Sequence, residues 1–528
     1  MSVPLDASSN KLCDEKLSND PTLLQYANSA TLHGIKSVLC PGAKVTVKRI
    51  VWSIILSIFA LTFLHTVYSK ITLFLRYEHI TQVDEESKTL KFPALTICNV
   101  NPVRVSAFTK NDLWNAGEMY DLLDKNKKLS SHISKKVSSH LLKISDFKNY
   151  RSSHFDLQDF QLRAGHQMKD MLLRCKWRNE RCYHYNFTPI LTSMGLCYQF
   201  NSKDTDDSYS PRKVYKGGQG NGLKLLLITQ EDDYLPPKTE EFEQTFEAGF
   251  KLQVHDADIP PLVKELGLGV SPGLQTFVVL QKTNLTYLGS PHGNCIPNVI
   301  REDGRYPYSE AECRITCETR DIVNICGCRL PFMPDLPDLP QSEIICKPDK
   351  VINCARKRLE FLEDGAACGP NSCAKTCYVT KYTASLSSVR FPIRALHKEY
   401  GHLSKNRTGF FKKNAVAISV YFQSLNSESI RQVKAYEFPS MLGDIGGLMG
   451  LFLGASAMTI FEFLTFVVNA ITVRVKKCFQ KLCYGKSTRT TSQSETYNGH
   501  RYTLAPLEAS NLSPRPLSQL SLTSLSTQ

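Results

Sequence analysis

The stretch IVWSIILSIFALTFLHTVYS, residues 50–69, contains no charged residue. A helix of this length, at about 1.5 Å per residue, crosses the roughly 30 Å hydrocarbon core of a bilayer. Trp52 and Tyr68 lie near its two ends, where amphipathic rings favour the membrane interface. A buried core helix or a signal peptide is the alternative, but the run is long and starts late for a signal, and no small-residue cleavage pattern follows it. We therefore predict a first membrane span over residues 50–71.

A second long apolar stretch, residues 445–473, contains a single acid, Glu462. Basic residues flank the two stretches on the sides of the chain ends: Lys44, Lys48 and Arg49 before the first, and Arg474, Lys476, Lys477 and Lys481 after the second. The positive-inside rule then places both termini in the cytoplasm of a plasma-membrane protein. The expected order is a cytoplasmic segment (1–49), the first span (50–71), an extracellular domain (72–436), a second span (437–473) and a cytoplasmic tail (474–528).

The net charge of +14 is concentrated at the ends of the chain. Residues 1–49 contain six Lys or Arg and four Asp or Glu, and residues 474–528 contain eight and two. A nucleic-acid-binding protein would instead show a basic stripe on a folded domain, so we expect no nucleic-acid partner. Residues 484–528 are rich in Ser, Thr, Leu and Pro without periodicity, which predicts disorder.

Fourteen of the eighteen cysteines fall in the expected extracellular domain. An even number in an oxidising compartment indicates seven disulfides. Zinc ligation is the alternative, but no paired CxxC spacing occurs, and Cys326 and Cys328 are too close for two ligands of a usual zinc site, so no metal is expected. Three sequons, at Asn186, Asn284 and Asn406, predict glycosylation outside the cell.

The extracellular domain reads as a mixed α+β structure. Runs rich in branched and aromatic residues predict strands over 89–100, 223–229, 250–255, 276–282 and 415–422. Hydrophobic periodicity predicts helices over 112–125, 309–325 and 349–363. Ten of the cysteines lie between residues 295 and 377, which predicts a stiff, disulfide-stapled subdomain.

The second span carries small residues at helical spacing. Gly446, Gly450 and Gly454 recur every four residues, and Ala455 and Ser456 extend the stretch. Close helix packing in lipid is one interpretation of such a face. The other is an interrupted helix whose carbonyl and hydroxyl oxygens replace the water around Na⁺, because irregular backbone is tolerated at this depth only where it lines a water-filled cavity.

Three acids favour the second interpretation. Glu462 lies within the span, where ionisable groups face water or a partner. Glu437 and Asp444 lie at the expected outer mouth, roughly on one face of a helix, and in a symmetric oligomer they would form rings that collect cations. Neither span carries an arginine ladder that could sense voltage. The sequence thus predicts a voltage-independent, Na⁺-conducting pore.

Several segments together resemble the acid-sensing branch of the epithelial sodium channel/degenerin family: TLHG at 31–34, FPALTICN at 92–99, AGHQMKDMLLRC at 164–175, GGQGNGL at 217–223, the 295–377 cysteine array and LGDIGGLMGLFLGAS at 442–456. The resemblance covers roughly residues 30–480. It implies a homotrimer or heterotrimer with a palm, finger, thumb and knuckle ectodomain, in the neuronal plasma membrane. It further implies an amiloride-sensitive, sodium-selective channel gated by extracellular protons, with Ca²⁺ as a blocker and no cofactor.

The resemblance also assigns roles to individual residues. It implies a selectivity filter at Gly454, Ala455 and Ser456, a pre-span pore segment at His33 and Gly34, a gate at Ser440, Ca²⁺ sites at Glu437 and Asp444, and a desensitisation linker at Leu425 and Asn426. It implies proton sensing by Glu231, Asp232, Asp233, Glu360, His79, Asp84 and Glu85. It implies the disulfides Cys98–Cys197, Cys175–Cys182, Cys295–Cys377, Cys313–Cys373, Cys317–Cys368, Cys326–Cys354 and Cys328–Cys346.

The chain departs from the family pattern at positions that bear on proton gating. Acid-sensing members commonly carry acids where this chain has Lys224, Arg356 and Ser419, and His and Trp where it has Glu78 and His292. Gating by protons needs carboxylates whose crowding raises their pKa, and a neighbouring cation opposes this. Histidines 79 and 292 still titrate in the useful range. We expect homomers that need stronger acid than typical members, or a subunit that works in heterotrimers or responds to another ligand.

Three other classes of protein fit less well. An ATP-gated channel would need a cluster of Lys and Arg for phosphates in the extracellular domain, and the cations here are scattered. A receptor without a pore would have no use for Asp444, Glu462 and the Gly-Ala-Ser segment in one span. An enzyme is not expected, because no HExxH, GxSxG or Walker-type motif occurs.

Overall fold

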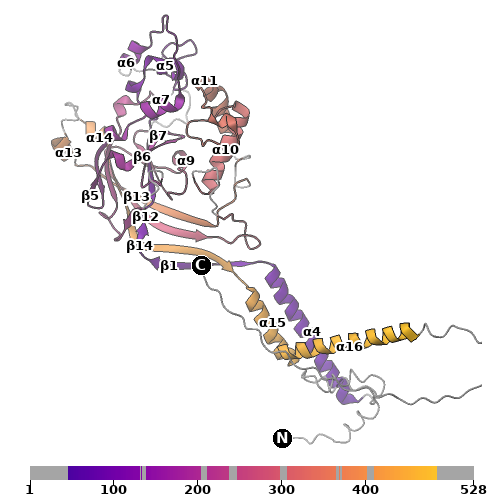
Figure 1. Cartoon of the computed structure of the whole chain (residues 1–528). Helices are drawn as coiled ribbons and strands as arrows, with labels where there is room; N and C mark the ends of the chain where they lie inside the picture. Colours follow the sequence, from indigo (N-terminus) through magenta and orange to yellow (C-terminus); the bar gives the residue numbers. More distant parts are fainter. Residues whose placement is uncertain are drawn as a thin grey trace, which may run out of the picture. The chain divides into compact units, whose positions relative to one another are not determined.

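A computed structural model describes residues 38, 46–130, 133, 138–203, 211–236, 247–297, 306–363, 368, 372–400 and 409–484 (Figure 1). The chain divides into two compact units, His65–Ile445 and a unit formed by both ends of the chain. The first unit contains the sheets and the disulfides, and the second contains most of the apolar helices.

The larger unit is built on two sheets. The first has the order β13 (Tyr378–Arg390), β12 (Leu274–Thr286), β14 (Ala415–Lys434), β9 (Leu223–Ile228), β4 (Leu172–Trp177) and β5 (Glu180–Cys182), and β1 (His79–Ser87) also pairs with β14. The second has the order β11 (Leu268–Val270), β10 (Phe250–His255), β3 (Ala94–Asn99), β7 (Gly195–Phe200) and β6 (Phe187–Thr192). A short pair, β2 (Leu90–Lys91) and β8 (Lys213–Val214), completes the described strands.

A single hydrophobic core joins the two sheets. All six residues of β3 and all six of β7 are buried, so these strands lie at its centre. Phe92, Trp177 and Phe200 pack with their rings 4.7–6.4 Å apart between centroids. This core gives β14 a fixed base, since the first half of that strand is buried and its second half is largely exposed.

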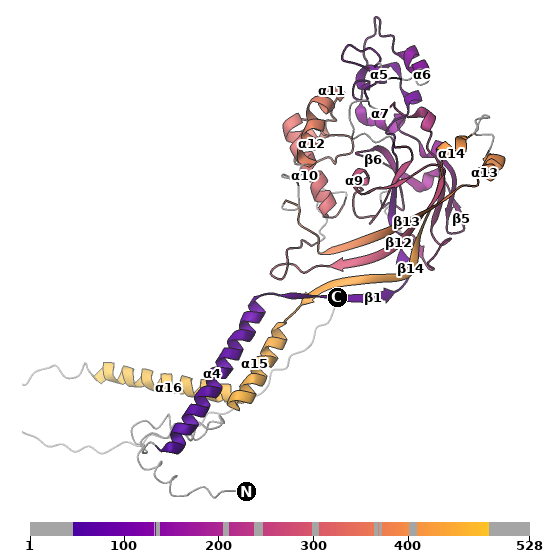
Figure 2. The same cartoon turned by 180° about the vertical axis from the view of Figure 1, so that it is seen from behind.

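Helices form a second core at the far end of the sheets (Figure 2). It combines α5 (Lys110–Ala116), α6 (Ser138–Ile144) and α7 (Leu157–Ala164) with α10 (Glu310–Cys326) and the helix formed by α11 (Pro348–Lys350), η5 (Val351–Ala355) and α12 (Arg356–Glu363). Ser309 caps the start of α10 and Gly327, at φ +70°, ends it. Arg358 of α12 donates to the Asp321 carboxylate of α10 at 2.6 and 2.9 Å, so a bidentate ion pair also joins the two helices.

The predicted helix over 112–125 is too long. The helix α5 ends at Ala116, and the chain then turns, with Asp121 at φ +56°. The turn needs a glycine at position 117, because a Cβ added there would lie 2.7 Å from the side chain of Leu123. Residues 117–125 are therefore folded back on the end of α5, where Leu122 and Leu123 join the helical core.

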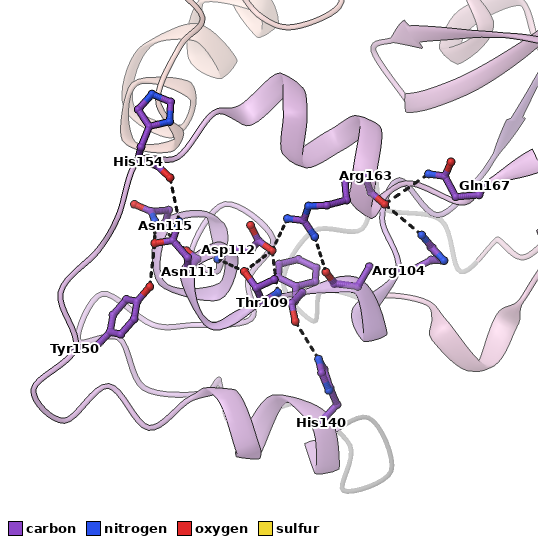
Figure 3. A network of polar contacts seen from close by, with 12 residues as sticks. Arg104, Thr109, Asn111, Asp112, Asn115, His140, Tyr150, His154, Arg163 and Gln167 are labelled. Carbon is purple, nitrogen blue, oxygen red and sulfur yellow. Dashed lines mark hydrogen bonds and ion pairs between the residues drawn. The ribbon is translucent and has the colours of Figure 1, made fainter.

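A capping network fixes the start of α5 (Figure 3). The Thr109 hydroxyl accepts the Asp112 N–H at 3.2 Å, and the Asp112 carboxylate accepts the Thr109 N–H at 2.8 Å. Arg163 of α7 donates to the same carboxylate at 2.6 Å, although Asp112 itself is buried. A buried carboxylate is tolerated here because three donors share its charge.

Replacing Thr109 by alanine is expected to lower the free energy of unfolding by about 1 kcal/mol, because the first turn of α5 loses its side-chain cap. For a unit of this size the melting temperature should fall by roughly 1 °C. Thermal unfolding of the detergent-solubilised protein measures the shift. Thr109→Ser keeps the hydroxyl and is the control, and equal stability of the alanine variant and the wild type would contradict the role of the cap.

Seven disulfides staple the larger unit, and they join the same seven pairs that the resemblance implied. Cys98–Cys197 links the central strands β3 and β7, and Cys175–Cys182 links β4 to β5. Cys313 and Cys317, one turn apart on α10, reach Cys373 and Cys368. The chain after α12 is thus held along α10 before it enters β13.

Three long helices carry the apolar stretches: α4 (Val47–Leu75), α15 (Phe438–Leu453) and α16 (Ala457–Tyr484). Arg49–Leu75 and Met458–Lys476 are long and apolar enough to cross a membrane, and Phe438–Leu453 is a shorter apolar helix. The first helix therefore extends beyond the expected 50–71 at both ends. The expected second span, 437–473, is divided between α15 and α16.

Candidate functional site

The interruption between α15 and α16 falls on the three residues Gly454, Ala455 and Ser456. Gly454 has φ +60°, in the left-handed region, and its N–H donates to the Gly450 carbonyl at 3.0 Å. A left-handed glycine with this bond is a common way for an α-helix to end. The Met449 carbonyl also accepts the Ala455 N–H at 3.4 Å, and the ladder of α15 ends there, so the carbonyls after Gly450 are open to another ligand.

Two hydrogen bonds between Ser456 and Thr459 define the start of α16. The Ser456 N–H donates to the Thr459 hydroxyl at 3.1 Å, and the Thr459 N–H donates to the Ser456 carbonyl at 3.0 Å. Ala455 and Thr459 are buried, while Gly454 and Ser456 are exposed. A backbone turn between two helices, with carbonyl oxygens outside the helical ladder, suits the coordination of a dehydrated cation. Sequence reasoning missed Thr459, whose signal was its position three residues after Ser456.

Both proposed mouth acids lie at the start of α15. Glu437 directly precedes the helix and its carbonyl accepts the Met441 N–H at 3.0 Å, while Ser440 is exposed on the first turn. Asp444 is not free: the Lys70 ammonium lies 2.8 Å from its Oδ2, and the Tyr436 hydroxyl donates to the same oxygen at 2.7 Å. Sequence reasoning missed Lys70 and Tyr436, because only the fold brings α4 beside α15 here.

The chain leaves α4 into β1 and reaches α15 from β14, and these two strands pair directly along their length (Figure 1). Their register runs from His79 opposite Lys434 to Ser87 opposite Asn426. A movement of β1 against β14 would therefore act on the end of α4 and the start of α15. We call this pair the β1/β14 ladder.

The ladder brings together residues that the resemblance named separately as proton sensors and as the desensitisation linker. The Asn426 amide donates to the Glu85 carboxylate at 2.7 Å, and the Lys88 N–H donates to the Leu425 carbonyl at 3.4 Å. Glu85 lies directly opposite Glu428 across the two strands. Like charges placed directly opposite each other disfavour a strand pair, so protonation of either acid would strengthen the ladder.

The predicted strand over 415–422 is too short, because β14 continues to Lys434 past an irregularity. Its pairing with β12 shifts from Leu280 opposite Phe422 to Lys282 opposite Ser427. Residues 423–426 thus lie opposite a single residue of β12, as a bulge that contains Leu425 and Asn426. The expected linker is a bulge within a strand, rather than a connection between two strands.

Two acids of the ladder form ion pairs with basic side chains. Asp84 bonds Arg431 of β14, and Glu86 bonds Lys88. The Arg431 guanidinium holds the pKa of the Asp84 carboxyl below its usual value, and Lys88 does the same for Glu86. Both carboxylates therefore stay charged as the pH falls through the mildly acidic range. Sequence reasoning missed Arg431.

Histidines 79 and 292 have separate partners near the junction between α4 and β1. The rings of Tyr77 and His292 are in edge contact, 5.3 Å apart between centroids. The Gln432 amide contacts the His79 ring at 3.1 Å and accepts the Leu288 N–H at 3.1 Å. Gln432 thus connects the Leu288 backbone to the His79 ring at the start of the ladder.

The remaining proton-sensing candidates lie in the upper part of the unit. Glu231, Asp232 and Asp233 form the short helix η3, and Asp233 accepts the Ser106 N–H at 2.7 Å. Glu360 is exposed on α12. Arg356 of the same helix donates to the Met119 carbonyl at 3.3 Å, so it anchors the segment after α5.

Lys224 stands in a row of basic and polar residues on the first sheet. It lies opposite Lys176 of β4 and Ser419 of β14. A carboxylate introduced at position 224 would therefore face a lysine, which would stabilise its charged form.

Of the remaining predicted sites, His33, Gly34 and Asn406 lie outside the described residues. Asn186 ends the short helix η2 (His184–Asn186), and Asn284 lies in β12; both are half-buried. Within the described residues, no group of three or more His, Cys, Asp or Glu is placed to hold a metal ion.

Comparisons with known proteins agree over most of the chain. The family model for the amiloride-sensitive sodium channel matches residues 26–466. Acid-sensing ion channel 1A of Danio rerio is 39% identical over 467 residues, covering 87% of this chain and 90% of its own. Acid-sensing ion channel 2 of Homo sapiens is 39% identical over 457 residues (85% and 87%), and acid-sensing ion channel 1 of Gallus gallus is 38% identical over 471 residues (88% and 86%).

A disulfide-rich extracellular domain that joins two membrane spans, the second interrupted at small residues, defines a membrane ion channel. The chain belongs to the amiloride-sensitive sodium channel family. It is accordingly a sodium channel subunit of the plasma membrane, of trimeric architecture, and not an enzyme.

Proposed function

We propose that this channel is gated by extracellular protons, conducts Na⁺ through the Gly454–Ser456 segment without voltage dependence, and is blocked by amiloride. The observation that carries the proposal is the β1/β14 ladder, which places titratable acids on the two strands that lead into the membrane helices. Protonation of Glu85 or Glu428 removes a repulsion between those strands, so their equilibrium depends on pH. The names of the relatives and of the family model support the acid stimulus and the blocker.

We further propose that the homomer needs stronger acid than is usual for an acid-sensing channel. Arg431 and Lys88 keep two ladder acids charged. Lys176 and Lys224 put like charges side by side on the first sheet. A second candidate function, a subunit that opens only within heterotrimers or to another ligand, is favoured by the same cations. Cytoplasmic termini, a neuronal location, glycosylation at the three sequons and Ca²⁺ block at the mouth remain part of this proposal.

Whole-cell recording of the homomer during steps to acid pH tests the proposal. We expect an inward Na⁺ current that amiloride blocks and that appears only below about pH 6.5. Histidines, and carboxylates whose pKa is raised, titrate in this range. Current only on co-expression with a related subunit would favour the second candidate. An acid-evoked current carried equally by K⁺ and Na⁺ would contradict the sodium-selective pore.

A cysteine at position 440 provides a test of the gate. Ser440 is exposed on the first turn of α15, so a bulky thiol reagent can reach Ser440→Cys. We expect modification to hold the channel open or to slow its closing severalfold, because the added group cannot be accommodated when the outer ends of the helices approach. The measurement is current decay before and after labelling. Unchanged decay after labelling verified by mass would contradict a gate at Ser440.

A further inference from the structure

The outer end of α4 neutralises an acid of α15. Lys70 Nζ lies 2.8 Å from Asp444 Oδ2, the Tyr436 hydroxyl donates to the same oxygen at 2.7 Å, and the ammonium lies 5.6 Å from the centroid of the Tyr436 ring. The Lys70 and Asp444 side chains are 38% and 41% exposed. The three side chains therefore form one cluster, within reach of solvent.

A half-exposed ion pair of this kind contributes little to stability. Its effect on the electric field is larger. Three copies of Asp444 around a threefold axis would form a ring of carboxylates, and such rings concentrate cations at a channel mouth. With Lys70 bound to each Asp444, the ring carries no net charge, and Glu437 alone supplies negative charge at the start of α15.

Divalent cations feel this difference more strongly than Na⁺, because the interaction energy scales with the charge of the ion. A single charge about 6 Å from a divalent ion alters its binding constant about tenfold even at the dielectric constant of water. Tyr436 adds to the effect, since its hydroxyl donates a hydrogen bond to the carboxylate oxygen that a cation would bind.

We propose that Lys70 is a specificity-determining residue of the pore mouth, which weakens divalent-cation binding by holding the carboxylate of Asp444. The inference rests on the proposed placement of Asp444 at the mouth of the conduction path. It predicts that this channel tolerates extracellular Ca²⁺ because its own lysine competes for the site.

The test replaces Lys70 by methionine, which keeps the length of the side chain and removes its charge. We expect the Ca²⁺ concentration that halves the Na⁺ current to fall about tenfold in Lys70→Met. Lys70→Arg is the matched control, because it keeps the charge, and should stay within about twofold of the wild type. The double variant Lys70→Met/Asp444→Asn should lose the added sensitivity, since the carboxylate is then absent.

A second measurement does not depend on gating. The purified trimer in detergent is heated with and without Ca²⁺, and the Ca²⁺-dependent rise in melting temperature should be larger for Lys70→Met than for the wild type or for the double variant. Equal block and equal stabilisation in Lys70→Met and wild type would overturn the proposal. So would a change in opening or closing rates alone, which would make the pair a tether between helices. A wild-type channel that does not select Na⁺ over K⁺ would instead contradict the proposed function.

Discussion

Gly454→Val is expected to abolish the selective Na⁺ current. Gly454 has φ +60°, a backbone conformation that costs a β-branched residue roughly 1–3 kcal/mol. Valine would favour continuing α15 through position 454, which would return the carbonyls of its last turn to the helical ladder. The measurements are current amplitude and the Na⁺/K⁺ permeability ratio, which should fall toward one in any residual current.

Gly447→Ala is the matched control. Gly447 lies within α15, has no positive φ, and an added Cβ would meet nothing within 4 Å in the chain. This variant should keep selectivity, so a general intolerance of the helix to larger residues is separated from the conformation of the break. Ser456→Leu should also lose selectivity, because it removes the hydroxyl at the start of α16. Unchanged permeability ratios in both Gly454→Val and Ser456→Leu would remove the segment from the conduction path.

Arg431→Gln is expected to make the channel respond to milder acid. The guanidinium of Arg431 lowers the pKa of Asp84, so that carboxylate remains charged until the pH falls below its lowered value. Removing the cation returns the pKa toward the ordinary carboxyl range. Glu86, which lies on the same face of β1, then raises the pKa of Asp84 further. The pH of half-maximal current should therefore move upward, and the current at the wild-type midpoint pH should increase.

Lys434→Gln is the control for the change in net charge. Lys434 lies on the same strand, opposite His79 and away from Asp84. Its loss removes one positive charge from the ladder without releasing Asp84, so its pH–current curve should stay closer to that of the wild type. Identical curves for Arg431→Gln and Lys434→Gln would show that net charge, rather than the Asp84 pair, sets the proton response.

Several features followed from the sequence because they depend on local composition. The apolar runs predicted both membrane helices, since a helix needs about twenty consecutive apolar residues to cross the hydrocarbon core. The helix over 309–325 agrees with α10 because hydrophobic periodicity is a signal within one segment, and the structure adds a serine cap and a terminal glycine at its ends. The Gly-Ala-Ser segment stood out for the same reason: small residues in an apolar run change the backbone locally.

Other features came from tertiary structure alone. The strand β1 is exposed at eight of its nine positions and so shows no hydrophobic alternation, and it forms only because β14 offers a partner. Asp84 and Arg431 are 347 residues apart, and the register of that strand pair decides that they meet. Lys70 reaches Asp444 only because α4 and α15 lie side by side at this point. The sequence thus determined which segments enter the membrane, whereas the charge of the mouth and of the ladder was decided by long-range pairing, because an ion pair depends on distances that no local pattern encodes.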